Sequence, residues 1–470
     1  MWVHGGGYGT GSGTQDVGDI TAINNNSFVS VVIQYRLGAF GFLSSDEVHH
    51  FGSVNAGLLD QHMTLKWVQE HIAKFGGDPR KVTIAGESAG AGSVMLQAMA
   101  YGGTLGTSMF DNIVAASPYL PMQYPYNGWE PSQSYYAFAE VAGCLSGRAY
   151  GNSSTKVIDC LRQAPSDALQ NANAIVGASG TWGTWAFLPV TDGDFVRQRP
   201  SQQLTSGKVN GKRVMSGNNA MEGASFVIPG VSTDADFEAW LRLEYPMLSS
   251  SDVEQVLNKF YPASNVSSVP YATCGDCGGA TAVNVGPIAV GAQQRAINLY
   301  SETTFVCPSY WLAAAFDPSH GKQAYKYQYS VPAAQHGADL GAEGLRAETA
   351  NVSPEFYDAF TTMWGNFITD KDPSISNELA NGNGSAAVNA ASGWPVFTTR
   401  GYGAYRMLNL NETGGQEYSA HVVAYPAPNA TQYEGPGLEN DFRVVDAYGW
   451  EGGRGARCDF WRQVGARVPE

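Results

Sequence analysis

The stretch VTIAGESAGAGSVMLQAMA (residues 82–100) places a short apolar run, a glycine-flanked serine and a longer Ala-rich run in direct succession. The run 82–88 is short and rich in β-branched residues, which predicts a buried strand, whereas 89–103 has the composition of a helix. Its centre, GESAG (86–90), fits the G-x-S-x-G pattern of a strand–turn–helix in which the serine occupies a strained turn. Small residues at Gly86 and Gly90 let the strand and the helix approach each other. A plain glycine-rich turn into a helix is the alternative explanation.

The segments around this turn repeat the order of strand and helix. We predict strands over 28–37, 82–88 and 112–118, and a helix over 58–75, where apolar residues recur on one helical face before Gly76 and Pro79. This alternation predicts an α/β fold with a mostly parallel sheet and helices on both faces.

Further along the chain, helical spacing predicts helices over 236–245, 253–261 and 355–369, and two more within 290–316. Strands are expected over 323–330 and 405–410, and an exposed polar loop over 378–393. We find no repeat and no clear linker, so we expect one domain over 1–470 with mainly helical insertions around 120–185 and 231–320.

The bulk composition restricts the partners and the compartment. The net charge of −15 argues against binding to nucleic acid or to anionic membrane surfaces. No uninterrupted run of eighteen apolar residues predicts a membrane span, and no secretory signal begins the chain. An even number of cysteines nevertheless suggests secretion. So do seven N-x-S/T sequons, at Asn25, Asn152, Asn265, Asn351, Asn383, Asn411 and Asn429. We therefore expect an extracellular protein whose N-terminal part is missing.

The first residues carry a second candidate functional loop. MWV (1–3) reads as the end of a buried strand, and HGGG (4–7) is the motif of oxyanion loops in lipases and esterases. Glycine leaves the backbone amides free to turn toward a ligand with no side chain in the way. We predict that the amides of Gly6 and Gly7, with that of Ala89, stabilise a negatively charged oxygen next to Ser88. A flexible glycine turn is the alternative.

Several longer stretches, taken together, resemble one family. They are VVIQYRLGAFGFL (31–43), 55–90, GNNAMEGASF (217–226), HGADL (336–340), MWGNFITDKDP (363–373) and CDFWRQ (458–463). The chain resembles the type-B carboxylesterases, which include cholinesterases and fungal lipases. The resemblance implies an α/β-hydrolase fold whose N-terminal strands are missing here, hydrolysis of carboxylic esters, and no metal or organic cofactor.

A serine hydroxyl needs a base, and the base needs a carboxylate to orient it. In this fold the chain order is Ser, then Asp or Glu, then His. The resemblance assigns the acid to Glu222 in KRVMSGNNAMEG (212–223), with Asp192 as the nearby alternative. It assigns the base to His336 in QHGADL (335–340). His4 belongs to the first loop, and His320 and His421 lack the motif. Four others precede the serine: His49, His50, His62 and His71.

Six cysteines allow fifteen pairings, and the sequence alone does not choose among them. The resemblance suggests the bridges Cys144–Cys160 and Cys307–Cys458. Cys274 and Cys277, in CGDC, could form a tight local bridge. A zinc site would need a second such pair or a pair of histidines nearby, and neither is present.

Three functions are open to this chain. The first is a secreted serine carboxylesterase or triacylglycerol lipase that forms an acyl-enzyme from a small-molecule or lipid ester. The others are a non-catalytic adhesion or binding protein and a structural or storage protein on the same fold. The presence of Ser88, Glu222 and His336 favours the enzyme. Trp182, Trp185 and Phe187 are candidates for an acyl pocket, although such aromatic clusters are more often core. Oligomeric state is not predicted.

Overall fold

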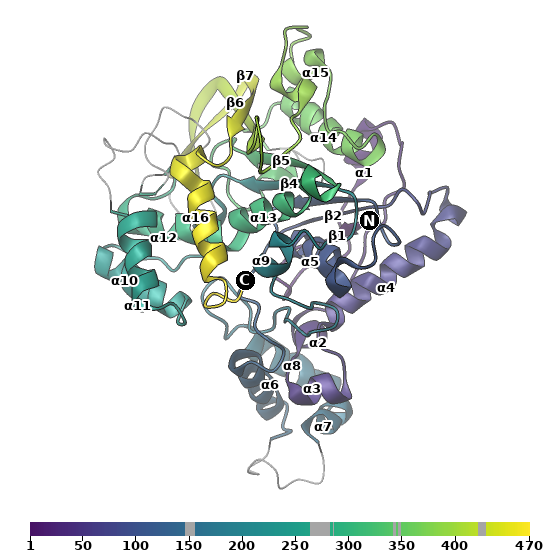
Figure 1. Cartoon of the computed structure of the whole chain (residues 1–470), viewed down its shortest axis with the longest axis vertical. Helices are drawn as coiled ribbons and strands as arrows, with labels where there is room; N and C mark the ends of the chain where they lie inside the picture. Colours follow the sequence, from purple (N-terminus) through teal and green to yellow (C-terminus); the bar gives the residue numbers. More distant parts are fainter. Residues whose placement is uncertain (146–155, 264–282, 285, 342–344, 346–348, 422–428) are drawn as a thin grey trace.

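The computed structural model describes residues 1–145, 156–263, 283–284, 286–341, 345, 349–421 and 429–470. At its centre is a single seven-stranded sheet, whose strands follow one another in chain order (Figure 1). The first six strands are parallel to one another, and the seventh is antiparallel to the sixth. The strands are β1 (Trp2–Val3), β2 (Thr83–Glu87), β3 (Asn112–Ala116), β4 (Arg213–Asn219), β5 (Gln323–Tyr329), β6 (Arg406–His421) and β7 (Asn429–Asp446).

Helices cover both faces of this sheet because successive strand residues point to opposite sides. Ile84 belongs to one apolar cluster, and the next residue, Ala85, belongs to the other. The first cluster is completed by α2 (Gly38–Phe42), α4 (Ala56–His71), α5 (Ala89–Gly103), α9 (Pro200–Thr205), α13 (Cys307–Ala315) and α16 (Trp450–Val464). The second is completed by α1 (Gly18–Ile23), α14 (Pro354–Thr369) and α15 (Asn377–Asn381). The predicted parallel α/β architecture is confirmed.

Two groups of helices lie outside these layers. The first contains α3 (Asp46–Phe51), α6 (Trp129–Val141), α7 (Val157–Gln163) and α8 (Ser166–Gly177), at the lower end of Figure 1. The second contains α10 (Asp234–Glu244), α11 (Ser250–Gln255) and α12 (Gly291–Ser301). Apart from α3, these helices fall within the insertions expected around 120–185 and 231–320. Within the described ranges, no helix combines the length and the apolar character that crossing a bilayer requires.

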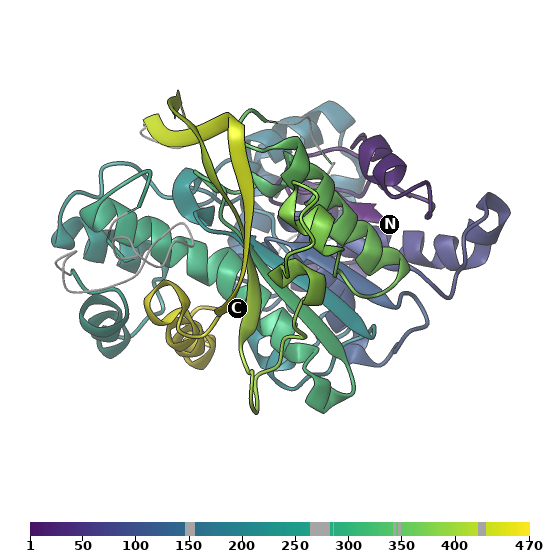
Figure 2. The ribbon, with the colours of Figure 1, turned by 90° about the horizontal axis from the view of Figure 1, so that it is seen from above.

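Three local predictions differ from the structure. The strand expected over 28–37 is a single bridge, Val32 to Trp2, because β1 offers only two residues for pairing. The strand expected over 405–410 is the start of a long hairpin of β6 and β7 that runs well past its neighbours (Figure 2). The exposed loop expected over 378–393 contains α15 and a 3₁₀ turn over Ala390–Gly393. That further strands precede residue 1 stays a prediction.

The C-terminal helix is held to the fold by a covalent bond and by buried charges. Disulfides join Cys307 to Cys458, and Cys144 to Cys160, as the resemblance implied. Next to the first bridge, the buried carboxylate of Glu302 pairs with Arg457 at 2.6 Å and with Arg454 at 3.3 Å. Because both guanidinium groups belong to α16, this cluster fixes the helix to the segment around Glu302. Cys274 and Cys277 lie outside the described residues.

The predicted glycosylation sites differ in accessibility. Asn25, Asn383 and Asn429 are exposed. Asn351 and Asn411 are half-buried, and the side-chain amide of Asn351 donates to the carbonyl of Pro332 at 2.8 Å. Asn152 and Asn265 lie outside the described residues. Glycosylation stays a prediction, and exposure favours the first three sites.

Candidate active site

Ser88 lies at the turn between β2 and α5, with φ 57° and ψ −126°, a conformation that is strained for a residue with a side chain. Three backbone hydrogen bonds hold it there. Its amide donates to Ala116, and its carbonyl accepts from Gly92 and Tyr119. A Cβ on Gly90 would overlap the carbonyl oxygen of Val3, so only glycine lets α5 pack this close to β1. The tight turn raises the serine above the end of the sheet.

His336 and Glu222 meet Ser88 at the carboxyl ends of neighbouring parallel strands. Glu222 follows β4 and His336 follows β5. The imidazole Nε2 is 2.9 Å from Ser88 Oγ, and Nδ1 is 2.6 Å from Glu222 Oε2. In the tautomer that suits both contacts, Nδ1–H donates to the carboxylate and Nε2 accepts from the serine hydroxyl. This arrangement can move a proton away from Ser88.

The carboxylate of Glu222 is fully buried and held by two donors on its other oxygen. Ser117 Oγ and the amide of Asn219 each donate to Oε1 at 2.6 Å. This leaves Oε2 to face the imidazole. Asp192, the alternative acid, instead accepts from Asn55 at 2.7 Å and from the amides of Asp194 and Val196 at 2.9 Å in a separate turn. Among the described residues, no hydrogen bond joins Asp192 to His336.

Two further carboxylates and two phenyl rings surround His336. Glu87 Oε1 is 3.3 Å from Nε2, and Asp339 also acts on the imidazole charge. The rings of Phe305 and Phe226 lie 4.3 and 5.2 Å from the imidazole centroid. Burial lowers the pKa of His336, but Glu87 and Glu222, with Asp339, outweigh it and raise the pKa to about 9. The imidazolium form is therefore strongly stabilised.

The contact of Glu87 with His336 was not predicted from the sequence, although Glu87 precedes Ser88 within GESAG. The signal available was a carboxylate at the end of a strand that is otherwise apolar.

The HGGG loop lies directly against the serine. A Cβ on Gly5 would be 2.9 Å from Ser88 Cβ. Gly6 and Gly7 adopt φ values of 107° and 63°, and across the described part of the chain neither amide hydrogen has a hydrogen-bond partner. The amide of Ala89, the first residue of α5, is likewise left without an intrahelical acceptor. The loop that carries Gly6 and Gly7 thus lies against Ser88 through Gly5, and Ala89 follows the serine directly. That the three amides bind an oxyanion stays a prediction.

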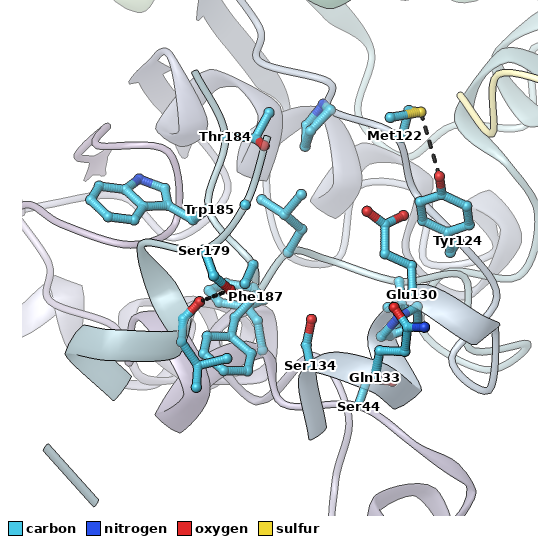
Figure 3. A pocket seen from close by; sticks show the side chains of 18 of the residues that line it. Ser44, Met122, Tyr124, Glu130, Gln133, Ser134, Ser179, Thr184, Trp185 and Phe187 are labelled. Carbon is cyan, nitrogen blue, oxygen red and sulfur yellow. Dashed lines mark hydrogen bonds between the residues drawn. The ribbon is translucent and has the colours of Figure 1, made fainter. Parts of the chain in front are cut away.

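Trp185 lines a cavity of about 300 Å³ (Figure 3) and also packs against this loop. The indole Nε1 is 2.8 Å from the position that a Cβ on Gly7 would occupy. Trp185 and Phe187 both line the cavity, whereas Trp182 does not line it and is 50% exposed. That these residues form an acyl pocket stays a prediction. No group of three or more metal-ligating side chains occurs among the residues that the structure describes.

Comparisons with known proteins agree with this architecture. The model of the carboxylesterase family matches residues 1–425. Carboxylesterase PatB of Aspergillus clavatus is 32% identical over 67% of this chain and 51% of its own length. The secreted triacylglycerol lipase LIP1 of Gibberella zeae is 28% identical over 80% of this chain and 63% of its own length. The inactive carboxylesterase-like protein VdtD of Byssochlamys spectabilis is 26% identical over 73% of this chain and 58% of its own length.

The chain thus spans between half and two thirds of the length of these curated relatives. Among solved structures, EstA of Aspergillus niger has a TM-score of 0.72 at 23% identity, covering 100% of this chain and 81% of its own. This likeness confirms the α/β-hydrolase fold. Because the family model matches most of its length, the chain belongs to the carboxylesterase family.

Proposed function

We propose that this chain hydrolyses carboxylic esters through Ser88, His336 and Glu222. The observation that carries the proposal is the hydrogen-bonded path from Ser88 Oγ to His336, at 2.9 Å, and on to Glu222, at 2.6 Å. The strained backbone of the serine and the unpartnered amides of the HGGG loop support the same chemistry.

In the proposed reaction, Ser88 Oγ attacks the ester carbonyl carbon while its proton passes to His336 Nε2. Glu222 holds the imidazole in the productive tautomer and stabilises its charge. The carbonyl oxygen gains the negative charge, and the amides of Gly6, Gly7 and Ala89 bind it. The C–O bond to the alcohol then breaks, and the alcohol leaves with the proton from His336. Water attacks the acyl-enzyme by the same route and releases the acid.

The substrate is an ester of a small molecule or a lipid. Triacylglycerol hydrolysis is the alternative within the same class, since LIP1 is named a secreted triacylglycerol lipase. Two disulfides and the secreted relative support an extracellular location. A non-catalytic binding function is the alternative of another class, because VdtD is named inactive. The intact arrangement of the three proposed catalytic side chains favours hydrolysis.

The test compares the parent chain with Ser88→Ala and with Ser108→Ala, a control at an exposed serine. We expect the parent and the control to hydrolyse p-nitrophenyl acetate and to react with a fluorophosphonate probe. Ser88→Ala should lose the labelling and about 10⁴-fold or more of kcat. Labelling that persists in Ser88→Ala would refute the assignment of the nucleophile. A correctly folded parent that neither labels nor turns over substrate would favour the binding function.

A further inference from the structure

A second cavity, of about 330 Å³, lies at the end of the sheet opposite to Ser88. Ser319 and His320 line it and precede β5, and further lining residues belong to the segment 397–405, which precedes β6. His336, by contrast, follows the carboxyl end of β5. Because β2 to β6 are parallel, this cavity lies at the amino ends of the strands and is separate from the proposed catalytic residues.

The floor of this cavity is aromatic and belongs to the core. Tyr310, Trp311 and Phe397 line it, and each is at most 6% exposed. The rings of Tyr405 and Tyr448 also line the cavity, with their centroids 4.9 Å apart. A cavity bounded by flat, rigid rings favours a ligand that is itself flat and apolar over most of its surface.

The backbone of Tyr405 is strained, and hydrogen bonds on both sides hold it in place. Its φ of 57° lies in the left-handed region, which a residue with a bulky side chain seldom adopts. Its amide donates to the carbonyl of Thr398 at 2.7 Å, and its carbonyl accepts from the amide of Ala447 at 2.6 Å. Strain of this kind recurs at binding sites, where it fixes the direction of a side chain.

Two arginines bring positive charge to the cavity. Arg400 and Arg462 both line it, and Arg400 is exposed. In the part of the chain that the structure describes, Arg400 forms no ion pair, and Arg462 contacts Asp459 at 3.1 Å through Nη2 alone. Burial and Asp459 raise the pKa of Tyr405, whereas Arg462 and Arg400 lower it. Both guanidinium groups therefore act on the same phenol hydroxyl.

The carboxylates near this hydroxyl already accept hydrogen bonds from the protein. Asp459 accepts from Arg462 on Oδ1 and from the Tyr448 hydroxyl on Oδ2, at 3.0 Å. Asp317 accepts from the amides of two loop residues and from hydroxyl groups, all within 3.1 Å; the donors are Ser319, Thr398 and Thr399. A cationic ligand would compete with these donors, whereas an anionic ligand meets guanidinium N–H groups that have no other acceptor.

We propose that this cavity is a second ligand site, which binds an aromatic carboxylate away from the catalytic centre. The ring of the ligand packs on Tyr310, Trp311 and Phe397, and its carboxylate pairs with Arg400, with Arg462 as a further donor. None of these residues takes part in the proposed ester hydrolysis, so the inference does not depend on that function.

The test titrates naphthalene-2-carboxylate into the parent chain by isothermal titration calorimetry. Naphthalen-2-ylmethanol and naphthalen-2-ylmethylammonium carry the same ring without the negative charge. We expect the acid to bind about tenfold more tightly than either, because hydrogen bonds between two charged groups are stronger than neutral ones. Raising the NaCl concentration from about 50 mM to about 500 mM should weaken binding of the acid and leave binding of the alcohol unchanged, since the pair with Arg400 is exposed.

Three variants locate the ligand. Arg400→Gln should weaken binding of the acid about tenfold and leave binding of the alcohol unchanged. Its matched control is Arg406→Gln, because Arg406 is an exposed arginine at the start of β6 that does not line the cavity. Ala314→Phe replaces a methyl group of α13 that lines the cavity by a ring, and should abolish binding of all three ligands. Circular dichroism checks that each variant is folded.

The acid failing to bind to the parent, or binding no more tightly than the alcohol, would overturn the inference. Equal losses in Arg400→Gln and Arg406→Gln would overturn the role of Arg400, because they would report only the net charge of this face. Undiminished binding to folded Ala314→Phe would place the ligand outside the cavity and overturn the site. The titration needs no turnover, so a parent that does not hydrolyse esters would contradict the proposed function alone.

Discussion

Replacing Glu87 by glutamine should shift the pH dependence of catalysis toward acid. Only neutral His336 can take the proton from Ser88, so activity requires a pH near or above the pKa of this histidine. Although burial lowers it, the carboxylates of Glu87, Glu222 and Asp339 raise this pKa to about 9. At pH 7 about 1% of the imidazole is then neutral, and kcat/KM should lie about 100-fold below its alkaline plateau.

The size of the shift follows from the contact between Glu87 Oε1 and His336 Nε2, which is 3.3 Å long. Two unit charges at this separation attract by about 1.3 kcal/mol in bulk water and by about 5 kcal/mol at an effective dielectric constant near 20. These limits correspond to about 1 and about 4 pKa units, and measured effects of one neighbouring charge are about 1–3 units. We therefore expect the kinetic pKa of Glu87→Gln to lie about 1–3 units below that of the parent.

The assay is kcat/KM for p-nitrophenyl acetate from pH 5 to pH 10, read at the isosbestic wavelength of the product, with Ser88→Ala as the background. The alkaline plateau of Glu87→Gln should also fall, since Glu87 stabilises the imidazolium that forms in the transition state. Glu140→Gln, which changes an exposed carboxylate of α6, should reproduce the parent profile. If the acid limb of Glu87→Gln coincided with that of the parent, Glu87 would not be the charge that raises the pKa of His336.

Two predictions concern stability. Glu302→Gln removes the buried carboxylate that pairs with Arg454 and Arg457, so it should lower the free energy of unfolding by about 3–5 kcal/mol in urea titrations. Glu238→Gln, which breaks only the exposed pair with Arg242, should cost less than about 1 kcal/mol. Burial raises the pKa of Glu412 from its ordinary value to about 7. Between the ordinary pKa and about pH 7 the folded chain therefore keeps a proton that the unfolded chain has released. The free energy of unfolding should fall as the pH rises through this range. Glu412→Gln should remove this fall and gain up to about 3 kcal/mol relative to the parent at pH 8; equal pH slopes for the two proteins would contradict the reasoning.

Local patterns predicted the elements next to Ser88 well, because the residues that specify each element lie within that element or directly beside it. The turn at Ser88 and the helix α4 are examples, since apolar spacing and flanking glycines specify them. The strand expected over 28–37 was wrong because pairing depends on the partner strand, and β1 is short. The hairpin of β6 and β7 was largely missed because its outer half is polar on both faces and has no apolar period.

Long-range partners in the site could be named only through the family resemblance. Ser88 and His336 are 248 residues apart, and no periodicity links them. The contact between Glu87 and the imidazole could not be predicted, because the direction of a side chain at the end of a strand depends on the loop that packs against it.

Trp185 has a consequence for how selectivity would be measured. One face of its indole contacts Gly7 and Gly9, and the residue also lines the cavity of about 300 Å³. An acyl group that reached this cavity would press on the same ring that packs against the HGGG loop. Discrimination between acyl chains should then appear mainly in kcat and less in KM, because a well-fitting chain helps to order the groups that act on the transition state. Binding of the substrate and alignment of the loop would be a single event in this protein.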